Sequence, residues 1–349
     1  MGVGRALRRR SGSGAAALKG LRRSVDRVDA GLLRLLNRRM RLVGEIARVK
    51  RAARLSVYAP DREEALLRAL TKSNRGPLID TSLMAIYREI LSAARAVAEP
   101  LQVAYLGPEA TFTHLAARER FGSQAGYLPV RSVGDVFYEV ERSQADYGVV
   151  PVKNSTEGVV NHTLDMFVES ELKICSEILL PIRHMLMSRA ARLDRVRTVY
   201  SHPQVFGQCR RWLEDHLHQA HLVEVSSTSE AARLAAEHSS AAAVGTELAA
   251  TLHGLRILAR GVEDTSANTT RFLVIGKTWS PRTGKDKTSV VCSVRDRVGA
   301  LEDMLMTFKQ RRINLTSIES RPSRQRAWDY WFFMDCAGHV DDAPVARAL

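Results

Sequence analysis

The segment VAYLGPEATFTH, residues 103–114, decides the class of fold. A short apolar run ends at Leu106, and a Gly-Pro turn then leads into the start of a helix, as in a strand–helix unit of an α/β protein. Further short apolar runs, alternating with helical patterns, lie at residues 147–152, 196–200, 222–225 and 272–275. This alternation predicts an α/β domain with a largely parallel sheet over residues 101–279.

Polar turns built from small residues follow four of the predicted strands. They read GPEATFTH at 107–114, PVKNSTEG at 151–158, SHPQ at 201–204 and NTTRF at 268–272. Such strand ends line the crevice in which α/β domains bind their ligands. The first turn also presents backbone N–H groups and hydroxyls at a helix start, a setting that suits a carboxylate.

These four motifs, together with Gln208 and Cys209, closely resemble prephenate dehydratase over residues 101–279. The resemblance implies two α/β lobes like those of periplasmic binding proteins, with prephenate bound between them. It makes Thr270 the catalytic residue, whose hydroxyl donates to the leaving C4 hydroxyl while the ring loses CO₂ and becomes aromatic. The substrate-binding residues that it implies are Thr111, Thr113, Asn154, Ser155, Ser201, Gln204, Gln208, Thr269, Arg271 and Phe272.

Two interpretations of Arg271 stay open: it pairs with a substrate carboxylate, or it braces its turn. His202 is interpreted as a structural residue of the turn rather than a general acid. The chain departs from the family pattern at Lys153, where Glu is usual, and at Ala110, where Gly is usual. We expect the inverted charge at Lys153 to alter neighbouring pKa values or to strengthen carboxylate binding.

An all-α unit is predicted over residues 18–98, before the α/β domain. No proline occurs between Ala15 and Leu55, and apolar residues recur there at helical spacing. A helix of about 35 residues would run roughly 50 Å, longer than a domain of this size covers by itself, so we expect it to be buried against a second chain. Two shorter helices are predicted over residues 61–72 and 79–97, with a break at 74–77.

Arg39 and Lys50 lie 11 residues apart, about three helical turns, and therefore share one face of the long helix. Buried cations require an anion. With the segments LRR at 21–23, LLRLLNRR at 32–39 and DRE at 61–63, they resemble the all-α chorismate mutase domain, an intertwined dimer of three-helix chains. The resemblance places Arg39 and the partner chain's Arg22 on the substrate carboxylates, Lys50 on the ether oxygen, Glu63 on the ring hydroxyl and Arg62 among the substrate-binding residues.

The mutase pattern fails at the end of the third helix. A pericyclic rearrangement needs a clamp on the reactive conformer and positive charge at the breaking C–O bond. Family members provide a Gln or Glu where Ala98 stands, and Ala94 and Ala59 replace two further polar positions. Glu99 lies about 100° around the helix from Ala98. Losing one donor typically costs about 10²–10³ in rate, so we predict weak or absent mutase activity.

A third unit follows the linker SPRTGK at 280–285. Its strand–helix–strand–strand pattern over residues 286–349, with RVGAL at 297–301 and ESRP at 319–322, resembles the ACT domain that follows dehydratases. The resemblance implies phenylalanine as an allosteric effector, bound between two such domains. Because the pattern stops after three strands, we expect an incomplete domain and doubtful feedback, or a module that only dimerises. The allosteric residues implied are Gly299, Ala300, Leu301, Glu319, Ser320, Arg321 and Pro322.

The net charge of +14 is concentrated in residues 1–60, which hold 16 Lys and Arg against three acids. Residues 1–17 are expected to form a disordered basic leader, with an organelle transit peptide as the alternative. The helices lack interleaved aromatics, so we expect no nucleic-acid partner. No apolar run is long enough to span a membrane, and the cysteines at 175, 209, 292 and 336 show no CxxC spacing. We therefore expect a cytoplasmic protein with no metal or other cofactor and no membrane partner.

The sequence thus predicts a bifunctional enzyme of phenylalanine biosynthesis that converts chorismate to prephenate and prephenate to phenylpyruvate. We expect a homodimer or a higher homo-oligomer. One alternative is a monofunctional dehydratase whose helices serve as a dimerisation platform. A second is a non-catalytic sensor of aromatic ligands, for which the hydroxyl of Thr270 would have no use.

Overall fold

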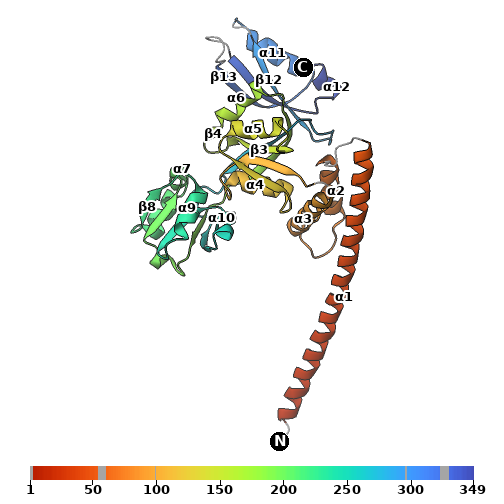
Figure 1. The fold of residues 1–349 in the computed structure, drawn as a ribbon, viewed down its shortest axis with the longest axis vertical. Helices are drawn as coiled ribbons and strands as arrows, with labels where there is room; N and C mark the ends of the chain where they lie inside the picture. Colours follow the sequence, from red (N-terminus) through yellow and green to blue (C-terminus); the bar gives the residue numbers. More distant parts are fainter. Residues whose placement is uncertain (1–2, 54–59, 99, 295–296, 323–329) are drawn as a thin grey trace.

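The computed structural model describes residues 3–53, 60–98, 100–294, 297–322 and 330–349. Figure 1 shows four bodies: a helical domain at the N-terminus, two α/β lobes and a small C-terminal domain. The first lobe lies centrally, next to each of the other three bodies. This arrangement confirms the predicted combination of a helical domain, a two-lobed α/β domain and an α+β domain.

The helical domain consists of α1 (Val3–Ala52), α2 (Pro60–Ser73) and α3 (Asp80–Ala98). Asp61 and Glu63 in the first turn of α2, and Lys72 in its last turn, complement the helix dipole. Because α1 starts at Val3, the expected disordered leader over residues 1–17 is wrong for the described part of that segment. Ala and Arg, which dominate there, favour helix.

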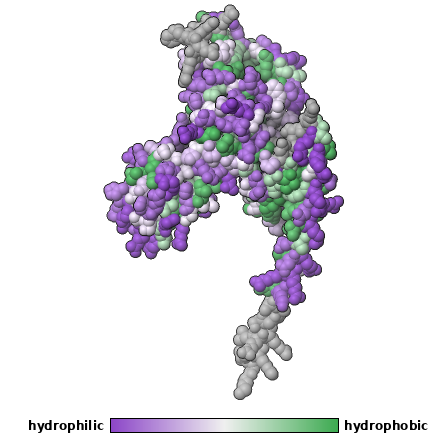
Figure 2. Space-filling view, viewed as in Figure 1, coloured by the Kyte–Doolittle hydropathy of each residue, from purple (hydrophilic) through white to green (hydrophobic). Residues whose placement is uncertain are grey.

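Helix α1 projects away from the rest of the chain (Figure 1) and carries apolar side chains that the other described segments leave exposed. Figure 2 shows hydrophobic patches on α1 beside hydrophilic ones. Leu21 and Val49 are 67% and 69% exposed. Such a row of exposed apolar residues on a helix needs a partner surface.

The first lobe is built on a sheet of strand order β2-β1-β3-β11-β5, with β4 paired to β3. Its strands are β1 (Gln102–Leu106), β2 (Gly126–Val130), β3 (Tyr147–Asn154), β4 (Gly158–Val159), β5 (Lys173–Pro181) and β11 (Thr269–Gly276). Its helices are α4 (Phe112–Phe121), α5 (Val133–Glu141) and α6 (Asn161–Glu169). Strands β1, β2 and β3 run parallel, whereas β11 is antiparallel to both β3 and β5.

The second lobe has strand order β10-β6-β9-β7-β8. Its strands are β6 (Met185–Ser188), β7 (Thr198–Ser201), β8 (His221–Glu224), β9 (Ala241–Gly245) and β10 (Arg256–Arg260). Its helices are α7 (Pro203–Gln208), α8 (Arg210–Leu217), α9 (Thr228–Ala235) and α10 (Glu247–Leu252), with a 3₁₀ turn η1 (Leu193–Arg195). Both sheets are mixed, so the expectation of a largely parallel sheet is only partly correct.

The chain crosses between the lobes twice, after β5 and after β10, and the two crossings lie side by side. The amide of Ile182 donates to the carbonyl of Asn268 at 2.9 Å. The amides of Gly261 and Val262 donate to the carbonyl of His184 at 3.0 and 3.1 Å. The returning crossing places β11 between β3 and β5, which makes the first sheet mixed.

The C-terminal domain contains β12 (Lys287–Val294), α11 (Ala300–Gln310), β13 (Leu315–Pro322), β14 (Tyr330–Ala337) and α12 (Ala343–Ala346). Its sheet is antiparallel with order β12-β14-β13. Its core is formed by Phe308, Met334, Cys336 and Val345.

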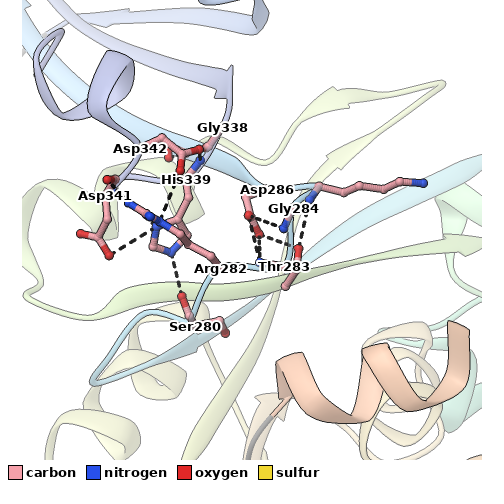
Figure 3. A network of polar contacts seen from close by, with 11 residues as sticks. Ser280, Arg282, Thr283, Gly284, Asp286, Gly338, His339, Asp341 and Asp342 are labelled. Carbon is pink, nitrogen blue, oxygen red and sulfur yellow. Dashed lines mark hydrogen bonds and ion pairs between the residues drawn. The ribbon is translucent and has the colours of Figure 1, made fainter. Parts of the chain in front are cut away.

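The linker predicted at 280–285 is fixed to the C-terminal domain rather than free (Figure 3). The Asp286 carboxylate accepts hydrogen bonds from the Thr283 hydroxyl at 2.6 Å and from the Gly284 amide at 3.0 Å. The His339 ring contacts the Ser280 carbonyl at 2.9 Å. These contacts order the linker against the domain that it introduces.

Candidate active sites

Asn154 and Thr270 form the centre of a polar cluster where β3 and β11 meet the junction of the lobes. The two residues face each other in the antiparallel register. The Asn154 side-chain amide donates to the Thr270 hydroxyl oxygen at 2.8 Å and to the Asn268 side-chain oxygen at 2.8 Å. Thr270 is only 8% exposed. Since its oxygen accepts the bond from Asn154, its hydroxyl hydrogen is left to donate to a ligand.

The loop after β3 is organised by the same asparagine. The side-chain oxygen of Asn154 accepts from the hydroxyl of Thr156 at 2.6 Å and from the amide of Glu157 at 3.1 Å, as in an Asx turn. The Ser155 hydroxyl accepts from the Thr269 amide at 2.9 Å. The predicted residues Asn154, Ser155, Thr269 and Thr270 are thus brought together.

Gln208, at the end of α7, joins the second lobe to this cluster. Its side-chain amide donates to the Glu157 carboxylate at 2.6 Å, across the lobe junction. Its oxygen lies 2.8 Å from Nε2 of His184 and 3.3 Å from Nδ2 of Asn268. Burial lowers the pKa of His184, the hydrogen bond with Gln208 opposing this only in part, so the ring is neutral near pH 7.

His184, Glu157 and Asn268 were not among the predicted site residues. Asn268 and Glu157 belong to the quoted motifs NTTRF and NSTEG, so a closer consideration of each motif position would have included them. His184 stands in an apolar stretch, PIRHMLM at 181–187, where a histidine is the one ionisable group after Arg183.

The polar groups of the turn GPEATFTH mainly form hydrogen bonds within the turn itself. The Thr111 hydroxyl donates to the Pro108 carbonyl at 3.0 Å and caps α4. Thr113 is buried. Ala110 has φ 63°, which explains why the family favours glycine there, and its amide donates to Nδ1 of His114 at 3.0 Å. Burial lowers the pKa of His114 to about 4, so this ring remains a neutral acceptor.

The structure places four other predicted substrate-binding residues outside the cluster. Phe272 lies in the hydrophobic core of the first lobe. The Ser201 hydroxyl is buried and donates to the Val244 carbonyl at 2.9 Å. Gln204 is exposed in the first turn of α7. Arg271 pairs with Glu177 and Asp335 on the opposite face of the sheet, so of the two open interpretations the structure favours a bracing role.

In the helical domain, Nη1 of Arg39 is buried and has no hydrogen-bond partner among the described residues. A buried guanidinium nitrogen in this state fits an anionic ligand. Lys50 is half-buried on the same helix, whereas Arg22 and Arg62 are exposed. The expected partner of Arg22 is a site in a second chain.

Glu63 is held by a residue that the sequence did not suggest. Both of its oxygens lie 2.6 Å from Nη1 of Arg95, whose Nη2 donates to the Phe121 carbonyl at 2.6 Å. Arg95 thereby ties the mutase-type residue Glu63 to the first lobe. Ala94 and Ala98 are buried on the same helix, and Ala59 and Glu99 lie outside the described residues.

The strand end that precedes the motif 297–301 and the strand end that carries the motif 319–322 lie at the same end of the C-terminal sheet. Val294, before the first motif, and Pro322, in the second, both face Tyr330 in the register. Gly299, with φ 80°, precedes α11, and Ala300 and Leu301 form its first turn. Glu319 and Arg321 pair with Lys153 and Asp165 of the first lobe.

Within the described ranges, no group of three or more His, Cys, Asp or Glu side chains is placed to hold a metal ion. Over the same ranges, no helix is both long and apolar enough to cross a membrane.

These features define a multidomain enzyme in which a helical domain and a two-lobed α/β domain each carry a polar site. Family models match all three units: "Chorismate mutase type II" over residues 21–99, "Prephenate dehydratase" over 103–279 and "ACT domain" over 288–349. The chain belongs to the family of bifunctional chorismate mutase/prephenate dehydratases.

Relatives of similar length share this organisation. The bifunctional chorismate mutase/prephenate dehydratase of Aquifex aeolicus is 47% identical over 95% of this chain and 93% of its own. The bifunctional chorismate mutase/prephenate dehydratase of Stutzerimonas stutzeri is 43% identical over 97% of this chain and 94% of its own. The crystal structure of prephenate dehydratase from Arthrobacter aurescens in complex with L-Phe matches with a TM-score of 0.66 and 35% identity, covering 71% of this chain and 84% of that chain. These comparisons do not favour the monofunctional or the sensor alternative.

Proposed function

We propose that the chain forms phenylpyruvate from chorismate in two steps, with each step in its own domain. The polar cluster around Thr270 at the lobe junction carries the dehydration of prephenate, and the helical domain carries the rearrangement of chorismate. The observation that best supports this proposal is the bond from Asn154 to Thr270, which leaves the Thr270 hydroxyl free to donate at the lobe junction.

In the dehydration, prephenate loses its ring carboxylate as CO₂ and its C4 hydroxyl as water. The electron pair of the breaking C–C bond enters the ring, which becomes aromatic, while the C–O bond breaks. Thr270 donates a hydrogen bond to the departing oxygen, where negative charge develops, and solvent supplies the proton that completes water. A neutral donor is sufficient because aromatisation provides the driving force.

The remaining polar residues position the substrate. Asn154 fixes the rotamer of Thr270, and Ser155 fixes the strand end at Thr269. Gln208 holds the second lobe against Glu157, so that the two lobes close around the same ligand. Preorganised donors of this kind cost no reorganisation during the reaction.

For the rearrangement, Arg39 and Lys50 supply positive charge within one chain, and Arg22 of a second chain completes the carboxylate clamp. The uncovered apolar row on α1, with Leu21 and Val49, supports a dimer through this helix. Ala98 offers no side-chain donor at the end of α3, so the rearrangement is the slower activity.

The C-terminal domain is proposed to bind phenylalanine beside Gly299 and Ser320, in a pair of such domains. Support comes from the match of the ACT domain family model to residues 288–349, and from the relative crystallised with L-Phe, which covers 71% of this chain. The four cysteines, which are free thiols, are compatible with the cytoplasmic location that we propose.

Two assays on the purified chain test this proposal: phenylpyruvate formation from supplied prephenate, and disappearance of chorismate. We expect rapid turnover of prephenate and much slower loss of chorismate. Failure to convert prephenate would refute the dehydratase proposal. Equal rates on the two substrates would refute the role assigned to Ala98.

A further inference from the structure

The strand pair that carries Thr270 has two functional faces. Asn154 and Thr270 face each other in the register, and the next pair is Lys153 and Arg271. Successive side chains of a strand point to opposite faces, so Lys153 and Arg271 lie on the face away from the lobe junction. A register shift follows between Arg271 and Phe272, which interrupts the regular ladder just beside the catalytic pair.

Both cations on this back face are held by the C-terminal domain. Nζ of Lys153 lies 2.8 Å from a Glu319 carboxylate oxygen. Nη1 of Arg271 lies 2.5 Å from the Asp335 carboxylate, and these side chains are only 18% and 12% exposed. Nε of Arg271 also pairs with Glu177 of β5 at 2.7 Å.

The two acids, Glu319 and Asp335, lie on adjacent strands and on the same face of the C-terminal sheet. Glu319 lies on β13 and Asp335 on β14, which pair with each other. Phe333, opposite Glu319 in the register, packs against a hydrophobic core of the first lobe. Arg321, two residues beyond Glu319, pairs with Asp165 of α6 at 2.8 Å. This face of the C-terminal sheet is therefore docked on the back of the catalytic strand pair.

Alternate side chains of β13 point to opposite faces of the sheet at the end that carries the motif 319–322. Glu319 and Arg321 are partly buried against the first lobe, whereas Ser320 and Pro322 are exposed. The exposed Ser320 and the Lys153 partner Glu319 are thus adjacent residues on opposite faces of this strand. The family's usual Glu at position 153 would instead place two carboxylates face to face in this chain.

We propose that Lys153 and Arg271 are positioning residues for the dehydratase reaction. Their ion pairs with Glu319 and Asp335 hold β3 and β11 in the register that sets Asn154 against Thr270. The placement of the C-terminal domain then controls the dehydration rate through these two pairs. The inference rests on the proposed dehydratase function and adds the route by which the C-terminal domain acts on it.

A charge reversal in the full-length chain tests the Lys153 pair. Lys153→Glu and Glu319→Lys are each expected to lower kcat for prephenate about fivefold, the size of an exposed ion pair, with KM changed less than twofold. The double variant restores the opposite charges and is expected to return to within about twofold of the unaltered kcat. Lys153→Arg, which keeps the charge, retains activity.

A second variant tests the more buried pair. Asp335 lies on the face away from the proposed substrate site, and its Oδ1 accepts a hydrogen bond from the Ser289 hydroxyl at 2.5 Å. Asp335→Asn keeps this acceptor oxygen but removes the negative charge that faces Arg271. We expect kcat to fall about tenfold without a matching change in KM. Reversal of Arg260 and Glu247, an ion pair of 2.9 Å on the second lobe, is the matched control and leaves kcat unchanged.

The outcomes separate the inference from the proposed function. If the unaltered chain does not convert prephenate, both fail. If the unaltered chain converts prephenate, and the double variant lowers kcat by the product of the two single fold decreases, only the inference fails. Unchanged kcat in every variant also overturns the inference, and circular dichroism establishes that each variant is folded.

Discussion

Arg95 is predicted to be the residue that secures the helical domain to the dehydratase domain. It is 9% exposed on α3, holds Glu63 with two contacts of 2.6 Å and donates to the Phe121 carbonyl at the end of α4. Arg95→Met keeps most of the apolar stem but leaves the Glu63 carboxylate without this partner and the Phe121 carbonyl without this donor.

The loss of folding stability expected for Arg95→Met follows from the burial of the Arg95–Glu63 pair. Breaking a fully buried ion pair costs about 3–5 kcal/mol, and since the Glu63 side chain is 20% exposed we reduce this to about 2 kcal/mol. Loss of the bond to Phe121 adds about 1 kcal/mol. A total of about 3 kcal/mol corresponds to a decrease in Tm of roughly 6–12 °C.

Thermal unfolding followed by circular dichroism measures this change. Arg88→Met is the matched control, because Arg88 also lies on α3 and reaches α4, but its contact with Glu119 is 3.5 Å and the two side chains are 37% and 39% exposed, more than those of Arg95 and Glu63. We expect the control to shift Tm by less than 2 °C. Equal shifts for the two variants would refute the assignment of Arg95 as the anchor.

Two further predictions concern acid stability and the mutase. The pKa of His114 is lowered to about 4 in the folded chain, so the unfolded chain binds more protons between pH 6.5 and 4. Folding stability should therefore decrease as the pH is lowered through that window. A Tm that stays constant from pH 7 to 4.5 would contradict this prediction. Ala98→Gln restores a donor at the end of α3 and should raise the rate of chorismate loss at least tenfold over the unaltered chain. Ala93→Gln, five residues earlier on a different face of the helix, should not raise it, and equal effects of the two substitutions would argue against the missing donor.

The local motifs predicted which residues meet in the polar cluster at the junction of the lobes. Asn154 and Thr270 are 116 residues apart in the chain, but each stands at the end of a recognisable strand beside small polar residues. Strand ends of one sheet meet at a common edge, so their proximity followed from the pattern. The long uncovered helix was likewise evident from its apolar spacing.

The orientation of neighbouring residues was not predictable from the same motifs. Arg271 and Phe272 directly follow Thr270 in the sequence, but strand alternation sends Arg271 to the C-terminal domain and leaves Phe272 in the hydrophobic core of the first lobe. Motif membership does not distinguish these directions. The pairing of Lys153 with Glu319 joins residues of different domains, and one sequence carries no signal for such a contact.

The helical domain shows the same limit. Lys50 and Arg39 were predicted from helical spacing, whereas Arg95 depends on how α3 packs against α2 and α4. An isolated arginine among alanines on α3 was the available signal. The mixed sheets arise because the chain returns from the second lobe between β3 and β5, a route that local patterns do not specify.

The central claim is that Thr270 acts as the donor to the leaving hydroxyl. Its most direct test measures prephenate turnover and prephenate affinity in Thr270→Val, with Thr270→Ser as the control that keeps a hydroxyl. We predict that Thr270→Val lowers kcat at least 10²-fold while affinity changes less than about threefold, and that Thr270→Ser retains most of the activity. Turnover by Thr270→Val within tenfold of the unaltered chain would contradict the account.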